Sequence, residues 1–200
     1  MKLRILLSIA VVLLASGCAS TKMTVKSDQR MTTPAADSAQ VVFMRSSFFG
    51  GAIQASIFEV TSGEPEFIGI LSAGTKLAYE VEPGEHVFMV VSEAADFMEA
   101  NLAGGKIYYS MVTPRMGAWK ARFSMHPVRN GAPGEFQYSS ERFQDWLMGT
   151  KFVANTPESE AWFKEHLYSI KSKQSEYWAV WQTKSEADLK ERTLNPEDGI

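Results

Sequence analysis

The most reactive side chain in the sequence is Cys18, the single cysteine among 200 residues. Because the chain has no second thiol, this cysteine cannot form an internal disulfide. An apolar run over residues 5–15 lies upstream of it, and the cations Lys2 and Arg4 precede that run. The run is far shorter than the roughly 20 residues that a membrane-spanning helix needs. Residues 1–17 are therefore predicted to be a secretory signal that is removed from the mature protein.

The residues immediately before the cysteine, Leu14-Ala15-Ser16-Gly17, resemble the bacterial lipobox. The resemblance implies transfer of a diacylglyceryl group to the Cys18 sulfur, cleavage between Gly17 and Cys18, and acylation of the new amine. Small side chains before the cleaved bond give the peptidase access to it, and only a thiol can form the thioether. Three acyl chains, at about 0.8 kcal/mol per buried CH₂, would anchor the protein stably. The alternative is a conventional signal that happens to end at a cysteine.

The lipobox also predicts where the protein is located. Lipoproteins of two-membrane bacteria with Asp after the cysteine tend to stay at the inner membrane, and here that residue is Ala19. We therefore expect a lipid-anchored cell-envelope protein, at the outer membrane and facing the periplasm if the source has two membranes. The formal net charge of -3 does not favour anionic headgroups, so membrane contact is expected through the Cys18 lipid. The same acidic balance argues against a nucleic-acid partner.

The three histidines are the first candidates for acid–base or metal chemistry. His86, His126 and His166 are 40 residues apart, unlike the short-range ligand pairs of common zinc sites. We therefore predict no metal site and no cofactor, and we expect His86 to bond a backbone group at the start of a strand. No nucleophile elbow, phosphate-binding loop or carboxylate pair is recognisable, so we predict no catalytic residue. The alternative is an envelope hydrolase that acts on glycan or peptide through His86 or His126.

A set of polar side chains is the stronger candidate for ligand binding: Arg45, His86, Lys106, Tyr108 and Tyr109. Adjacent residues on a strand point to opposite faces, so one tyrosine should be in the core and the other can be exposed. An exposed tyrosine beside Arg45 and Lys106 could bind a glycan or an acidic ligand. The alternative, which we favour, is that Arg45 and the tyrosines close one end of the β domain by hydrogen bonds.

The rest of the sequence must provide the elements that position these groups. Its composition, with 45% hydrophobic and 22% charged residues, is typical of a globular protein and excludes collagen-like, disordered and polytopic membrane classes. Residues 18–38 are an exception, because they contain almost no large apolar side chain. A segment of this composition cannot bury enough surface to offset its ordering entropy. We therefore predict that the lipidated Cys18 is followed by a flexible linker.

Residues 39–128 contain short β-rich runs separated by Gly and Pro turns, such as Ala39 to Arg45 and His86 to Ser92. Runs of this kind at 8–12-residue spacing indicate a sandwich or barrel. No helix-length pattern interrupts them, which argues against a parallel sheet built from βαβ units. The predicted fold is mainly β with α: an antiparallel β-sandwich of seven or eight strands, followed by a helical C-terminal extension.

The extension begins after a predicted loop and short helix over 129–155. Thr156-Pro157 combines an N-cap hydroxyl with Pro at the first helical position, and an apolar stripe of helical period follows. We predict an amphipathic, aromatic-rich helix or helix pair over 156–193, with a break near 171–175 if there are two, and a frayed tail over 194–200. Trp162 and Trp178 lie beside the stripe and widen its apolar face. We expect this face to pack on the sandwich; the alternative is a surface for a partner or an oligomer.

Four motifs occur in order within the β region: Val42-Phe43-Met44-Arg45, Ile68-Gly69-Ile70-Leu71, Pro83-Gly84-Glu85-His86 and Ala103-Gly104-Gly105-Lys106-Ile107-Tyr108-Tyr109. They resemble a bacterial lipoprotein domain family of unknown function, whose members show apolar-x-Arg, G-x-L, P-G-x-H and A-G-K-x-Y-Y patterns. The chain departs from the last pattern by one additional glycine. The resemblance implies a small β-sandwich in the cell envelope and supplies no catalytic residue.

Together, the patterns predict a lipid-anchored envelope protein that acts as a non-enzymatic binding or structural module. An envelope protein or a glycan would bind through the 156–193 helix or through the sandwich.

Overall fold

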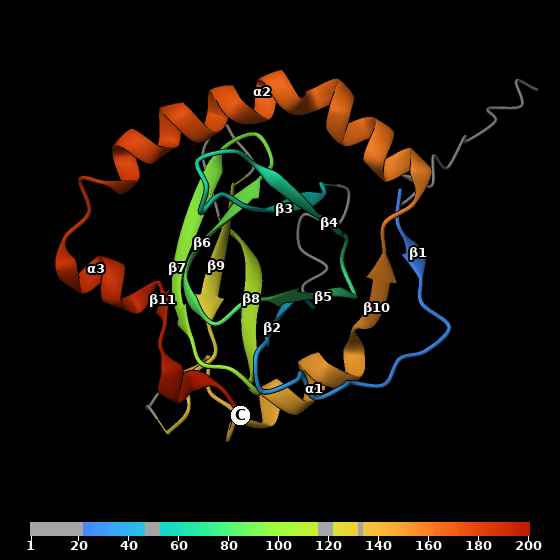
Figure 1. Ribbon diagram of the computed structural model, residues 1–200, viewed down its shortest axis with the longest axis vertical. Coiled ribbons are helices and arrows are strands. Elements are labelled where there is room, and N and C mark those ends of the chain that lie inside the picture. The colour runs from blue at the N-terminus through green and yellow to red at the C-terminus, as the bar shows by residue number, and fades with distance from the viewer. Residues whose placement is uncertain (1–21, 47–52, 116–121, 132–133) are drawn as a thin grey trace, which may run out of the picture.

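The computed structural model describes residues 22–46, 53–115, 122–131 and 134–200. The predicted signal, its cleavage site and Cys18 lie outside these ranges. Within them the chain is mainly β, with two sheets and a long helix near its C-terminus (Figure 1). None of the described helices is both long enough and apolar enough to cross a membrane. The predicted mainly-β class with a helical extension is confirmed.

The described strands form two sheets, each with strands from distant parts of the chain. The first has the order β1 (Thr24–Val25), β10 (Lys151–Ala154), β5 (Thr75–Val81), β2 (Ala39–Arg45), β8 (Ile107–Arg115) and β9 (Arg122–Pro127). The second has the order β11 (Thr193–Leu194), β7 (Ala95–Leu102), β6 (Gly84–Val91), β3 (Ala55–Glu59) and β4 (Glu66–Leu71).

The prediction that all strands are antiparallel is wrong. β2 runs parallel to β8, β10 to β5 and β11 to β7, while the other pairs are antiparallel. After β2 the chain passes through β3 and β4 of the second sheet, returns with β5 on one side of β2, passes through β6 and β7, and returns with β8 on the other side. Strand runs and turns predict that strands exist, but the direction of pairing depends on which distant strands meet, and parallel pairs need a long crossover.

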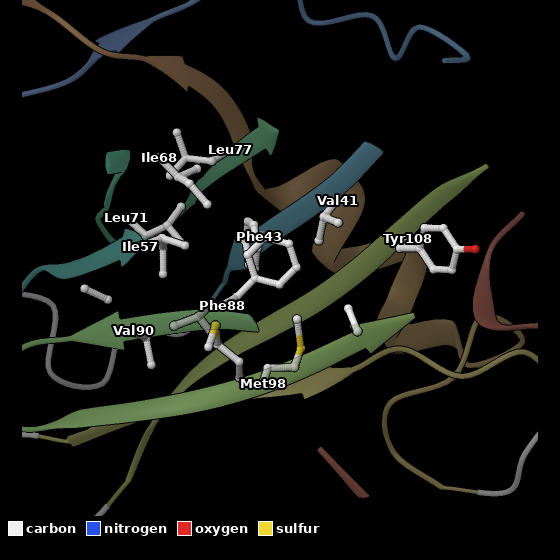
Figure 2. Close-up of a cluster of buried hydrophobic side chains, with 14 of the residues drawn as sticks. Val41, Phe43, Ile57, Ile68, Leu71, Leu77, Phe88, Val90, Met98 and Tyr108 are labelled. Carbon is white, nitrogen blue, oxygen red and sulfur yellow. The ribbon is translucent and has the colours of Figure 1, made fainter. Parts of the chain in front are cut away.

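The core between the sheets contains side chains from both. Figure 2 shows Phe43 of β2 and Phe88 of β6 meeting there, with ring centroids 5.2 Å apart and the rings nearly perpendicular. The outer face of each sheet is also covered, because α1 (Glu141–Gly149) packs on the first and α2 (Pro157–Trp181) on the second. A strand buried on both faces has a continuous apolar run, which explains why every residue of β2 is buried.

The helical extension follows the local sequence signals closely. Thr156 caps α2, its hydroxyl accepting from the Ser159 backbone, and Pro157 occupies the first turn as expected. A second helix, α3 (Glu186–Glu191), follows. The two helices are separated over residues 182–185, and α2 is continuous through the predicted break at 171–175. The region over 129–155, predicted to contain only a loop and a short helix, also contributes the strand β10 to the first sheet.

The segments on either side of the folded body differ from their predictions. The linker prediction covers 18–38, but Thr24 and Val25 pair with β10, and the Gln29 side chain bonds the Phe152 backbone. The tail predicted to fray over 194–200 has Leu194 and Asp198 buried and contains a 3-10 turn, η1 (Pro196–Asp198). In both segments the stabilising groups lie more than 60 residues away, which explains why local composition could not predict the packing.

Candidate functional site

The predicted binding residues do not form one site. Arg45 lies at the end of β2 and is fully buried. Its Nη1 donates to the carbonyl oxygens of Ile53 at 2.5 Å and Leu71 at 3.2 Å, and its guanidinium lies 4.6 Å from the Phe123 ring centroid. Burial lowers the pKa of Arg45 to about 10. Arg45 therefore joins backbone segments inside the protein and is not accessible to a ligand.

Tyr108 and Tyr109 point to opposite faces of β8, as strand geometry predicts, but both are buried. Tyr109 packs edge-to-face against Tyr138 and Phe143 beneath α1. The Tyr108 hydroxyl accepts from the Ala103 amide at 2.8 Å and donates to the Pro196 carbonyl at 3.3 Å. Figure 2 shows this hydroxyl directed out of the core, toward the C-terminal segment. Neither tyrosine is therefore available to an external ligand, and the hydrogen bonds of Tyr108 agree with the alternative that we favour.

The chain's own C-terminal segment covers the surface beside Lys106 and Tyr108. Lys106 Nζ donates to the carbonyls of Pro196 at 2.9 Å and Gly199 at 3.2 Å, and Ile107 exchanges two backbone hydrogen bonds with Ile200. A Cβ at position 199 would lie 2.6 Å from Cζ of Tyr108, so only glycine allows this close approach. The Lys106 ammonium, which was a candidate for binding an acidic ligand, therefore donates its hydrogen bonds to backbone carbonyls of the same chain.

His86 lies elsewhere, in a polar network between β3 and β6. Its Nδ1 is 2.6 Å from Oε1 of Glu59, and its Nε2 is 2.8 Å from the Glu82 carbonyl oxygen. Glu59 also accepts from the Tyr79 hydroxyl at 2.8 Å and from the Thr61 hydroxyl at 2.8 Å. The expected backbone contact of His86 is thus present, together with a carboxylate that the sequence did not indicate.

His86 and Glu59 each stabilise the charged form of the other. The hydrogen bond to Glu59 raises the pKa of His86 despite burial, and the Glu82 carbonyl adds to the effect. Burial alone would raise the pKa of Glu59, but the bonds from His86, Tyr79 and Thr61 lower it overall. Since both neighbours of the ring are acceptors, both ring nitrogens donate and His86 is an imidazolium. A ring in this state has no free lone pair with which to act as a base.

The other two histidines are separate from this network. His126 Nε2 is 2.9 Å from the Thr113 hydroxyl, and its ring stacks on Phe136. Burial and the charges of Arg192 and Arg115 lower the pKa of His126 to about 4. His166 lies on α2, where Nδ1 donates to the Trp162 carbonyl at 2.8 Å. In the described ranges no three His, Cys, Asp or Glu side chains are close enough together to hold a metal ion.

The structure reveals a surface groove that crosses β6, which we call the β6 groove. It consists of two hollows, of about 420 Å³ and about 390 Å³, that share Thr61 and Val87. The first is lined by Val60, Thr61, Gly63, Val87, Lys171, Gln174, Ser175 and Trp178. The second is lined by Thr61, Glu85, His86, Val87, Glu99, Ala100, Asn101 and Thr193.

The two ends of the β6 groove differ in chemistry. The α2 end has an apolar lining from Val60, Val87 and Trp178, whose indole also packs edge-to-face on Phe97 at 4.9 Å. The other end is lined by the carboxylates of Glu85 and Glu99, by an amide and by the His86 ring, whose charge is paired with Glu59, and Glu85 there is exposed. Such an arrangement suits a ligand that places an apolar group beside Trp178 and a hydrogen-bonding or cationic group near Glu85.

His86 is the one member of the predicted binding set that lines the β6 groove. The other lining residues come from the loop after β3, from β6, β7, α2 and β11, so periodicity within one segment could not group them. Trp178 did carry a signal, because it lies beside the apolar stripe of its helix. Comparison of the chain with protein-family models and with curated proteins finds no match in either.

Proposed function

We propose that this chain is a lipid-anchored protein of the cell envelope, facing the periplasm if the source has two membranes, that acts as a non-enzymatic binding module. The lipobox-like residues before Cys18 support the anchor. The observation that carries the binding role is the β6 groove, in which an apolar hollow beside Trp178 and an acidic, polar hollow beside His86 share two residues. Its ligand is a segment of an envelope protein in which an apolar side chain neighbours a basic one.

The groove can be tested by photo-crosslinking in intact cells. A crosslinking residue replaces Gln174 in the apolar hollow or Asn101 in the polar one, and Asp145, exposed on α1 away from the groove, serves as the matched control. We expect both groove positions to capture the same partner and Asp145 to capture none. Trp178→Ala should reduce the capture at Gln174. Equal capture from Asp145, or none from either groove position, would contradict the proposal.

The anchor is tested separately. Cys18→Ser removes the only thiol in the chain, so the protein should remain an uncleaved precursor and incorporate no palmitate. Persistent palmitate labelling of this variant would rule out the proposed anchor while leaving the groove experiment unaffected.

The alternative of a hydrolase acting through His86 or His126 gains no support from the geometry. Both nitrogens of His86 are engaged by acceptors, and His126 packs against Phe136 with its pKa lowered to about 4. His126 Nε2 does lie beside the Thr113 hydroxyl, but a ring with so low a pKa is a poor general base near neutral pH. We therefore propose only the binding function.

A further inference from the structure

We infer that the amino-terminal end of α2 faces the phospholipid surface of the membrane, because only a few residues separate Cys18 from the folded body. The inference rests on the proposed lipidation of Cys18. The predicted flexible linker over 18–38 would let the domain lie far from the bilayer in any orientation. A tether of a few residues instead keeps one particular end of the molecule at the bilayer.

Residues 22–24 are attached to the folded body. The Lys22 carbonyl accepts a hydrogen bond of 2.6 Å from the Thr156 hydroxyl, at the cap of α2, and Lys22 Nζ lies 3.6 Å from Glu158. The next side chain, Met23, is 6% exposed and belongs to the core between the sheets. Thr24 then pairs with β10. The chain is therefore fixed beside the first turn of α2 from Lys22 onward.

Covalent geometry limits the distance from the lipid to this point. Four peptide links separate Cys18 from Lys22, and since an extended chain spans at most about 3.3–3.6 Å per residue, the two Cα atoms are at most about 14 Å apart. A linker free as far as residue 38 would have allowed about 70 Å. The interfacial layer of a bilayer is itself roughly 5–7 Å thick. Lys22 and the first turn of α2 are therefore held at or next to the headgroups.

The residues at this end include exposed ones that can contact headgroups. Glu158 lies on the first turn of α2, and Val25 of β1 is 56% exposed. Figure 1 shows β1 and the start of α2 on the same side of the molecule, opposite α3. The charges are mixed, since Lys22 lies beside Glu158. The tether, and not attraction to anionic lipid, therefore determines the orientation.

This orientation places the β6 groove away from the tethered end. At 1.5 Å per residue, Lys171 and Trp178 lie about 20–30 Å along α2 from Pro157. A ligand can thus reach the groove at the end of the molecule farther from the tether while the protein remains attached to the membrane.

Fluorescence quenching can test the orientation in the intact lipoprotein. Lipidation blocks the only native thiol, so a fluorophore can be attached selectively at Glu158→Cys or, in a separate protein, at Glu186→Cys in α3. Each protein is placed in phosphatidylethanolamine–phosphatidylglycerol vesicles that carry a quencher on the lipid headgroup. We expect several-fold stronger quenching at position 158 than at 186. Equal quenching at the two positions, or stronger quenching at 186, would overturn the inference.

A spacer variant tests whether the short tether is the cause. Inserting about 20 Gly and Ser residues after Ala19 adds a coil with a root-mean-square length of roughly 25 Å. Quenching at Glu158→Cys should then fall to the level at Glu186→Cys, and unchanged strong quenching would contradict the role of tether length. Failure of lipidation is distinguishable, because the protein would then not bind the vesicles at all.

Discussion

The N-terminal segment over 22–38 and the C-terminal segment over 193–200 pack on the same body by different means. The C-terminal segment is held by buried groups: Leu194 is fully buried, and Asp198, 3% exposed, pairs with Arg129 at 2.6 Å. The N-terminal segment is mostly exposed. Besides Met23 and the partly buried Met31, it is held by hydrogen bonds of Lys22, of the two-residue strand β1, of the Gln29 amide and of the Ala35 and Ser38 carbonyls.

The comparison shows that a segment can pack on the folded body without contributing much to the free energy of unfolding. Removing one partner of a buried charge pair leaves an uncompensated charge, which is costly. Losing an exposed hydrogen bond costs little, because water replaces it. We therefore expect the C-terminal segment to contribute much more to the free energy of unfolding than the N-terminal one.

The largest effect is expected from Asp198→Ala, which leaves Arg129 without its carboxylate. The variant should lower the free energy of unfolding by about 3 kcal/mol, measured by urea denaturation of the mature chain carrying Cys18→Ser. The matched control is Glu197→Ala, since this neighbouring side chain is exposed and should change stability by no more than about 0.5 kcal/mol. Equal effects of the two variants would mean that the buried pair does not hold the tail.

Gly199→Ala should have the next largest effect, because the added Cβ would lie 2.6 Å from Tyr108 and 2.8 Å from Lys106. The φ of Gly199, -83°, suits alanine, so the cost is steric, about 2 kcal/mol. Hydrogen exchange of the Ile200 amide should accelerate as the tail detaches. Gly149→Ala is the control, since a Cβ there has no heavy atom within 4 Å; destabilisation of similar size by this control would exclude tail packing as the cause.

A charge pair in the body provides an intermediate case. His86→Gln should lower the free energy of unfolding by about 1.5 kcal/mol near pH 6, where both Glu59 and His86 are charged. Because the pKa of His86 is raised from 6.5, its contribution is complete below pH 6.5 and is lost as the pH rises through the folded-state pKa. Because the pKa of Glu59 is lowered, its contribution to stability persists to low pH and is lost only in strong acid, when the carboxylate is protonated. Urea denaturation should therefore show a smaller difference from the unmutated chain near pH 9, and a constant difference would exclude the ion pair.

The smallest effect is expected from Gln29→Ala in the N-terminal segment. The Gln29 amide accepts from the Phe152 backbone N–H at 2.7 Å and donates to its carbonyl at 3.1 Å. Loss of these bonds should lower the free energy of unfolding by about 1 kcal/mol and speed hydrogen exchange at the Phe152 amide. Thr32→Ala, at an exposed position of the same segment, should leave this exchange unchanged. An effect of Gln29→Ala as large as that of Asp198→Ala would remove the distinction between the two segments.

The site was harder to predict than the elements that carry it. Strand period places Tyr108 and Tyr109 on opposite faces correctly, but it cannot reveal that α1 covers Tyr109 and that the C-terminal segment covers the hydroxyl of Tyr108. Arg45 does form hydrogen bonds, as in the alternative that we favour, but its complete burial depends on the backbone carbonyls of Ile53 and Leu71, which no local pattern places beside it. Thr61, Val87 and Trp178 meet in the β6 groove from segments far apart in the chain.

The sequence by itself determined the features that depend on neighbouring residues. The runs of β-branched and aromatic residues specified strands, and Thr156-Pro157 specified where α2 begins, because side-chain sterics and capping bonds act within a few residues. The tertiary structure alone decided the parallel pairing of β2 with β8, the docking of both terminal segments and the position of the β6 groove. These features depend on contacts between residues far apart in the chain, which form only when the sheets and α2 pack together.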